Sequence, residues 1–287
     1  KKFVSMTGGY HGDTFGAMSV GFSSGFYEPY EDFLMKSINI PYPDYWEGKN
    51  DIEKEELISL EKADEVLSTN KDDIVAVIIE PLIQGAGGMR VCREEFLDKL
   101  LKKFREAGVL IIFDEVMTGF GRTGKMFAAD YLKTKPDIIC LAKSLTGGYI
   151  PLAATVFSKK IHDEFFGDDI KKTFLHGHSF TANPIACSAA LTSIELFKKE
   201  KTLKKVEKIS HIHQECIRKL KKINISKPRV IGSIAAFEFN GIDQTYGSLD
   251  NQRLKNIFLE NGLLLRPLGN TIYLMPPYCI KENTLYK

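Results

Sequence analysis

The sequence predicts an α/β fold built around a mostly parallel sheet. Short apolar runs rich in β-branched residues alternate with longer segments of helical periodicity, which is typical of such folds. The run at 109–113 is apolar on both faces, as expected of a strand covered by helices on each side. With 287 residues, 44% of them hydrophobic, the chain is long enough to bury a large core.

The first part of the chain supplies the predicted sheet and its helices. It opens on a strand, a glycine turn and a helix of small residues. Residues 22–50, rich in aromatic residues and proline, are expected to form a loop, and the glycines of 84–88 predict a turn. The other expected elements are, in order, a polar helix over 53–69, a strand over 74–79, an amphipathic helix over 93–107, and strands over 109–113, 138–142 and 153–157.

The pattern changes in the last third of the chain, where the candidate strands become short. We therefore expect a large domain over residues 1–205, incomplete at its N-terminus, and a smaller domain over residues 206–287. The expected elements are, in order, a polar turn over 174–184, helices over 185–199 and 202–223, a strand over 230–239, a helix over 249–260, and strands over 263–266 and 271–275.

Charge and cysteine content narrow the class of protein. The net charge of +2, from 39 basic and 37 acidic residues, gives no argument for a nucleic-acid or membrane partner. No apolar run approaches the ~20 residues of a membrane span, and no signal peptide is visible. The cysteines are scattered without a CxxC pattern, which predicts reduced thiols in a cytoplasmic protein; they are Cys92, Cys140, Cys187, Cys216 and Cys279.

Two charged residues end two of the predicted strands. Asp114 follows the run 109–113, and Lys143 follows the run 138–142. Ligands of open α/β sheets bind at the carboxyl ends of the strands, so an acid and an amine are expected to share one crevice. That pair suits a pyridoxal phosphate enzyme, in which a lysine forms the Schiff base and a carboxylate keeps the pyridine nitrogen protonated. This role requires a lysine that is neutral part of the time, so we expect Lys143 to be buried near other charges. Taken singly, Asp114 could be a helix N-cap and Lys143 a solvated side chain.

Six segments, read in order, resemble one enzyme family. They are GGYHGDT, EPLIQGAGGM, FDEVMTGFGRTG, LAKSLTGGYIPLAA, HGHSFTANPIAC and RPLGNTIYLMPPY. Together they are similar to the class III aminotransferases, which belong to the large fold-type I group of pyridoxal phosphate enzymes, and the resemblance covers essentially the whole chain. It implies a three-layer large domain, a smaller α+β C-terminal domain, pyridoxal 5'-phosphate as cofactor, a homodimer and ping-pong transamination.

The resemblance implies a set of cofactor-binding residues. Lys143 would be the catalytic lysine, and Asp114 would hold the pyridine nitrogen. His178 and Ser179 would bind the cofactor phosphate across a dimer interface, and Gly177 would contact the substrate. The matching family members often have Pro-Thr where this chain has His178-Ser179; the serine keeps the hydroxyl, and the role of the histidine stays open. A simple capping turn is the alternative for this segment, and its two histidines lack further ligands for a metal.

The implied substrate-binding set is Tyr10, Arg122, Arg266 and Tyr273. Arg266 would bind a substrate carboxylate in bidentate fashion, with Tyr273 nearby. Tyr10 would stack on the cofactor or line the substrate site. The structural alternatives are a core aromatic for Tyr10 and a surface arginine at a strand end for Arg266. His11 is left without a role, and Glu80 either supports the site or forms a structural salt bridge.

Ala86 favours one branch of the family. Ornithine-, GABA- and acetylornithine-type relatives carry at this position a glutamate that pairs with the substrate-binding arginine. The resemblance therefore favours the biotin-synthesis branch, with 7-keto-8-aminopelargonate as amino acceptor and S-adenosylmethionine or lysine as donor. A class III transaminase of ω-amino acids or diamines, and a non-catalytic truncated fold-type I protein, are the alternatives. The family's second phosphate loop and its substrate-site tryptophans lie upstream of GGYHGDT, so we expect the chain to be a fragment.

Overall fold

A computed structural model describes residues 1–21, 26–70, 72–220 and 224–286 of the chain. Its main sheet contains, among these residues, six strands in the order β2-β1-β3-β6-β7-β8. All neighbouring strands pair in parallel except β7 and β8, which are antiparallel. The mostly parallel α/β sheet predicted from the sequence is therefore confirmed. The strands are β1 (Lys2–Met6), β2 (Ile38–Ile40), β3 (Ile74–Ile79), β6 (Leu110–Asp114), β7 (Ile138–Leu141) and β8 (Ala154–Phe157).

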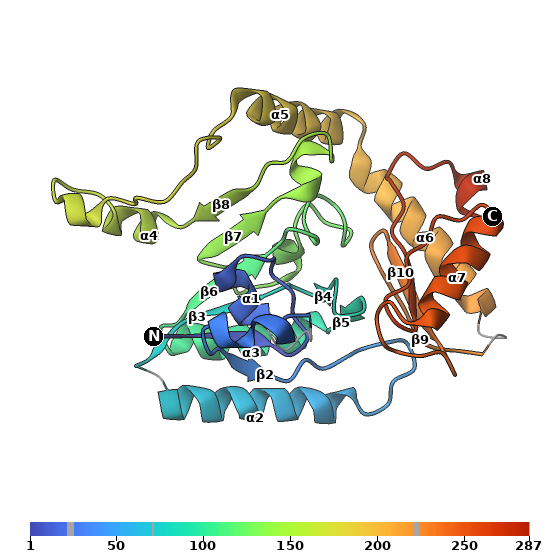
Figure 1. The fold of residues 1–287 in the computed structure, drawn as a ribbon, viewed down its shortest axis with the longest axis horizontal. Helices are drawn as coiled ribbons and strands as arrows, with labels where there is room; N and C mark the ends of the chain where they lie inside the picture. Colours follow the sequence, from blue (N-terminus) through green and yellow to red (C-terminus); the bar gives the residue numbers. More distant parts are fainter. Residues whose placement is uncertain (22–25, 71, 221–223, 287) are drawn as a thin grey trace.

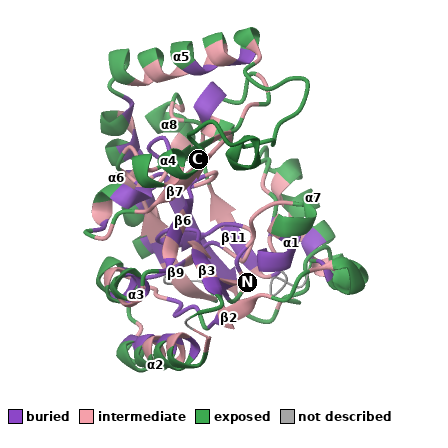
Figure 2. Ribbon diagram, turned by 90° about the vertical axis from the view of Figure 1, so that its left-hand side faces the viewer, coloured by how far each residue is buried: buried purple, intermediate pink, exposed green. Residues whose placement is uncertain are grey.

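Helices cover both faces of this sheet. On one side lie α2 (Ile52–Asn70) and α3 (Glu94–Glu106), and on the other lies the short α1 (Phe15–Gly21) (Figure 2). The predicted apolar face of α3 is wholly buried in one cluster with Ile111 and Phe113 of β6, and it consists of Phe96, Leu97, Leu100, Leu101 and Phe104. The 3.6-residue periodicity of α3 therefore defines which side of the helix meets the sheet.

A second, antiparallel sheet follows in the order β11-β10-β9 (Figure 1). It consists of β9 (Ile225–Ile231), β10 (Ile234–Phe239) and β11 (Thr271–Leu274). The helices associated with it are α6 (Thr202–Leu220), α7 (Leu249–Glu260) and α8 (Glu282–Leu285). Ile217 of α6 joins Ala235, Phe237 and Ile272 of this sheet in one apolar core, so the α+β character predicted for the last third is confirmed. The division of the chain after residue 205 stays a prediction, and it falls in the first turn of α6.

Several expectations about individual elements were wrong. The strand expected over 230–239 is a hairpin, because Gly232 and Ser233 form a turn between β9 and β10. Residues 263–266 form no strand. The loop expected over 22–50 contains a 3-10 helix, η2 (Glu28–Phe33), and the edge strand β2. Residues 22–25 of that loop and 221–223 of the helix expected over 202–223 lie outside the described part of the chain.

An extended arm connects β8 to the helix α5 (Pro184–Lys199) (Figure 1). The arm contains α4 (Lys159–Glu164) and the 3-10 turn η5 (Ile170–Lys172) and is almost entirely exposed. The remaining short elements are β4 (Ile83–Gln84), β5 (Arg90–Val91), η3 (Ala128–Tyr131) and η4 (Lys143–Thr146). Within the described residues, no helix combines the length and the apolar character that crossing a membrane requires.

Acid should weaken the packing of α6 through His213. This side chain is 2% exposed, and neither ring nitrogen has a hydrogen-bond partner among the described residues. Burial lowers the pKa of His213 from 6.5 to about 4. As the pH falls from 6.5 to 4, His213 therefore binds a proton in the unfolded chain but not in the folded chain, and the folded state loses stability. Between pH 7 and pH 5, the free energy of unfolding measured with urea should fall by about 2 kcal/mol more in the wild type than in His213→Leu. An equal loss in both proteins would contradict this account.

Gly232 should be essential to the contact between the two sheets. Its φ is +53°, and a Cβ there would lie 2.3–2.4 Å from main-chain atoms of residues 122–124. Gly241 is a matched control, because its φ is +80° but a Cβ would meet nothing within 4 Å. In thermal or urea unfolding, Gly241→Ala should cost about 1 kcal/mol for the left-handed backbone. Gly232→Ala should add about 2 kcal/mol or more from the clash. Equal losses would show that the tight contact is not real.

Candidate functional site

The carboxyl ends of four parallel strands meet at one edge of the main sheet. Tyr10 lies in the loop after β1, Glu80 follows β3, Asp114 ends β6 and Lys143 follows β7. The register pairs Asp114 with Cys140, three residues before Lys143, and the N–H of the residue after Asp114 donates to the Cys140 carbonyl at 2.9 Å. The strands therefore deliver the predicted acid and amine to the same edge, as expected for a ligand site in an open α/β sheet.

The carboxylate of Asp114 is buried and held from two sides. Its Oδ1 accepts the main-chain N–H of Val116 at 3.0 Å, and its Oδ2 lies 2.8 Å from Nδ1 of His11. The side chains of His11 and Asp114 are only 2% and 9% exposed. His11, which the sequence left without a role, is thus the direct partner of the predicted cofactor carboxylate and restricts its rotation.

Lys143 occupies a strained backbone position. Its φ is +44°, in the left-handed region that side-chain-bearing residues rarely adopt, and it begins η4. Such strain persists only where the surroundings impose it, and it clusters at functional sites. The expectation that Lys143 is buried was wrong, because the residue is exposed. It lines a pocket of about 1240 Å³ together with Arg122, Tyr278 and residues along the length of α5.

Glu80 acts on the main chain of the site. Its Oε1 accepts the N–H of Tyr10 at 3.0 Å, and its Oε2 accepts the N–H of Gly85 at 2.9 Å. Burial raises the pKa of Glu80 to about 7, although the nearby His11 opposes this rise. The salt bridge considered for Glu80 is absent from the described residues, and its hydrogen bonds instead tie the Tyr10 loop to the turn after β4.

A run of aromatic rings links two of the predicted substrate residues. Tyr10 packs edge-on against Phe26, with ring centroids 6.3 Å apart, and Phe26 packs edge-on against Tyr246 at 5.9 Å. Arg266 donates a hydrogen bond to the hydroxyl of Tyr246 and lies over its ring, 5.4 Å from the centroid. Burial raises the pKa of Tyr273, and the charge of Arg266 opposes that rise. Tyr10 and Arg266 are thus joined through Phe26 and Tyr246, whereas Tyr273 packs against the apolar cluster that contains Met89 and Ile234.

Arg122 is engaged in packing the two sheets together. Its Nη1 donates to Ser233 Oγ at 3.2 Å and to the Pro276 carbonyl at 3.1 Å, and its guanidinium lies over the Tyr278 ring at 4.4 Å. Burial lowers the pKa of Arg122. The residue lines the pocket of Lys143, but its donors are directed at the second sheet and the segment after β11.

The segment predicted to hold the phosphate is not brought to this edge. Gly177, His178 and Ser179 lie in an exposed turn of the arm. Among the described residues, His178 forms local hydrogen bonds, since its main-chain N–H donates to Thr181 Oγ1 and its Nδ1 accepts the N–H of Phe180. In the described part of the chain, the Ser179 hydroxyl is therefore presented outward rather than toward Asp114 or Lys143.

Glu115, which the sequence did not single out, supports the loop between β6 and η3. It is fully buried, and its carboxylate accepts main-chain N–H groups of Ala128 and Ala129 and the hydroxyl of Thr118, each at 2.8 Å. These bonds close the loop that carries Arg122 and begin η3. The only sequence signal was a second carboxylate immediately after Asp114.

Comparison with known proteins agrees with this geometry. The class-III aminotransferase family model matches residues 1–287. The adenosylmethionine-8-amino-7-oxononanoate aminotransferase of Synechococcus elongatus is 43% identical over 99% of this chain, and that of Staphylococcus aureus is 39% identical over 96%. The chain spans 66% and 62% of the lengths of these two relatives.

Solved structures agree as well. The chain superposes with a TM-score of 0.88 on the adenosylmethionine-8-amino-7-oxononanoate aminotransferase of Methanocaldococcus jannaschii, at 36% identity, covering 99% of this chain and 65% of that one. An amine transaminase from an uncultivated Pseudomonas species, solved in its PLP-bound form, gives a TM-score of 0.90 at 28% identity, covering 99% and 66% of the two chains. Because the family model matches residues 1–287, this chain belongs to the class-III aminotransferases.

Proposed function

We propose that this chain is the catalytic body of a pyridoxal phosphate-dependent aminotransferase. It would convert 8-amino-7-oxononanoate (7-keto-8-aminopelargonate) to 7,8-diaminopelargonate in biotin synthesis. The observation that carries the proposal is the joint delivery of Asp114 and the strained Lys143 to one sheet edge. The names of the relatives from Synechococcus and Staphylococcus support the acceptor, and they favour S-adenosylmethionine over lysine as the amino donor.

The residues at the edge fit the cofactor. Asp114 is a buried carboxylate whose orientation His11 and the Val116 N–H restrict, as a partner for a protonated ring nitrogen requires. Lys143 follows β7, the strand whose Cys140 pairs with Asp114. Bound there, pyridoxal phosphate supplies an electron sink for negative charge at the substrate Cα. Ser179 would hold the phosphate, with His178 beside it.

The chain's own groups would then hold one proton on the ring nitrogen and move another from the substrate Cα. Asp114 keeps a proton on the ring nitrogen by accepting its hydrogen bond. The Nζ of Lys143 would take the proton from the substrate Cα and deliver it to the cofactor carbon that receives the amino group, a task for an amine on a flexible stem. The exposure of Lys143 is consistent with an amine that must exchange places with an incoming substrate amine.

Arg266 would bind the carboxylate of the acceptor. Its guanidinium is exposed and forms no ion pair with a carboxylate in the described part of the chain. Ala86 offers no acid to compete for it. A planar guanidinium binds a carboxylate through two parallel hydrogen bonds, while Tyr10 and Tyr273 would pack against the aliphatic chain. Arg122 would border the opposite side, in the pocket of Lys143.

We further propose a cytoplasmic homodimer. The arm before α5 exposes Phe166, Leu175 and Phe180 by 72–84% of their surface, which is unusual for side chains of this size. A second copy packed on the arm would cover these side chains. It would also give Gly177, His178 and Ser179 a site to face, across the interface.

Loss of Lys143 should abolish the visible absorbance of the protein. Full-length protein purified with pyridoxal phosphate should absorb in the visible, and Lys143→Ala should lose that band together with about 10³-fold or more of its activity. Lys159→Ala, an exposed lysine paired with Asp163, is the matched control and should keep both. A Lys143→Ala protein that retains the wild-type band would end the assignment.

A panel of amino acceptors should identify the substrate. Full-length protein should transfer an amino group to 8-amino-7-oxononanoate, and Arg266→Gln should raise the KM for this acceptor about 10- to 100-fold, because a charge-assisted pair is lost. The visible band should be unchanged in this variant. Activity on small keto acids or aldehydes with none on 8-amino-7-oxononanoate would instead favour an ω-amino acid or amine transaminase, the class of the Pseudomonas neighbour.

A further inference from the structure

The turn over residues 85–89, which joins β4 to β5, has a conformation that needs external support. Gly88 and Met89 both have positive φ, +102° and +52°. The second of these is the left-handed region that a methionine rarely adopts. Inside the turn, the N–H groups of both residues share one acceptor, the Gly85 carbonyl, at 3.2 and 3.0 Å. The carbonyls of Gly88 and Met89 therefore need partners from elsewhere.

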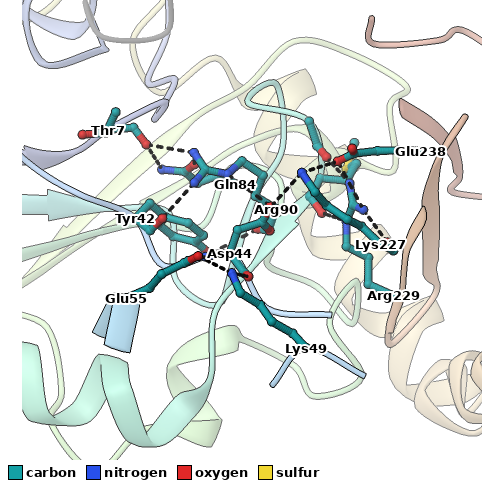
Figure 3. Close-up of polar contacts among 12 residues, drawn as sticks. Thr7, Tyr42, Asp44, Lys49, Glu55, Gln84, Arg90, Lys227, Arg229 and Glu238 are labelled. Atoms are coloured by element: carbon teal, nitrogen blue, oxygen red, sulfur yellow. Dashed lines mark hydrogen bonds and ion pairs between the residues drawn. The ribbon is translucent and has the colours of Figure 1, made fainter. Parts of the chain in front are cut away.

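Arg229 of β9 supplies those partners. Its Nε donates to the Met89 carbonyl, its Nη2 to the Gly88 carbonyl and its Nη1 to the Lys227 carbonyl, each at 2.6 Å. The residue is only 5% exposed. Figure 3 shows the guanidinium between the second sheet and the strand that carries Arg90. A side chain of the second sheet thus holds the backbone of the turn between β4 and β5, which form a separate two-stranded sheet.

The charges around Arg229 indicate that its guanidinium positions the turn rather than forming a close ion pair. The carboxylate of Glu238 lies 3.9 Å from Arg229 but 3.1 Å from Lys227, and Asp44 is 3.7 Å from Lys227. Burial lowers the pKa of Arg229. A buried cation held mainly by neutral carbonyls gains little net stability, because its desolvation is costly. The planar fork does, however, define the positions of the carbonyls that it binds.

The 85–89 turn is in direct contact with the proposed substrate wall. The Gly85 N–H donates to Glu80, whose other oxygen accepts the Tyr10 N–H. A Cβ on Gly87 would lie 2.5 Å from the Gly8 carbonyl, so the turn and the Tyr10 loop pack backbone against backbone. Ala86 lies in the same turn. A shift of the turn would therefore move Tyr10 and Ala86 together.

We propose that Arg229 is a positioning residue for the amino acceptor: by holding the 85–89 turn, it sets the place of Tyr10 and Ala86 in the substrate wall. This inference rests on the proposed function. It extends the site to a residue of the second sheet that does not touch the substrate. It also makes the fit of the acceptor depend on how the two sheets are packed.

The test compares Arg229→Lys with Arg93→Lys in the full-length holoenzyme. Arg93 is a matched control, because it forms a bidentate pair with Glu56 that ties α3 to α2, away from the site. Arg229→Lys keeps the charge and loses the fork. It should raise the KM for 8-amino-7-oxononanoate about tenfold while changing kcat and the visible band by less than about twofold. Arg93→Lys should leave KM unchanged.

Hydrogen exchange provides a second readout that needs no activity. The amides of residues 85–90 should exchange about tenfold faster in Arg229→Lys than in wild type or Arg93→Lys, with or without cofactor. Unchanged exchange, or faster exchange with an unchanged KM, would overturn the inference. A wild-type enzyme inactive on 8-amino-7-oxononanoate would overturn the proposed acceptor instead, and the exchange result would still report on Arg229.

Discussion

The parallel pairing of β1, β3, β6 and β7 is the constraint on which the rest of the structure depends. Because parallel strands all end at the same edge, the residues that follow them must meet there, however far apart they lie in the sequence. The pairing of Asp114 with Cys140 brings an acid and an amine to that edge. His11, in the loop after β1, contacts Asp114. Glu80, the residue after β3, accepts the main-chain N–H of Tyr10 at the same edge.

Two arginines connect this edge to the second sheet in different ways. Arg122 reaches outward from the main-sheet unit to Ser233 and the Pro276 carbonyl. Arg229 reaches inward from β9 to the carbonyls of the 85–89 turn. The proposed cofactor site lies at the strand edge, whereas the proposed substrate wall also depends on contacts between the two sheets. This division explains why the cofactor is easier to infer from the chain than the substrate.

Local patterns predicted the elements well and the contacts poorly. The helix α3 and the strands β6 and β7 were predictable because periodicity and β-branched runs reflect burial on one or both faces. The Gly232-Ser233 turn does have a local signal, because two residues of this type between strands indicate a hairpin. Three other features depend on residues far apart in the chain, which no local pattern encodes: the antiparallel pairing of β8, the contact of His11 with Asp114, and the hydrogen bonds from Arg229 to the 85–89 turn. The exposure of Lys143 and the outward turn at Ser179 were likewise not predictable, because they depend on how η4 and the arm pack.

The central claim is that Lys143, at the end of β7, holds the cofactor beside Asp114. Reduction of the full-length holoenzyme with borohydride, followed by peptide mapping by mass spectrometry, tests this claim most directly, because reduction makes the lysine–cofactor bond permanent. The account predicts a pyridoxyl label on the peptide that contains Lys143 and on no other lysine. A label on a different lysine, or no label in protein that absorbs in the visible, would contradict it.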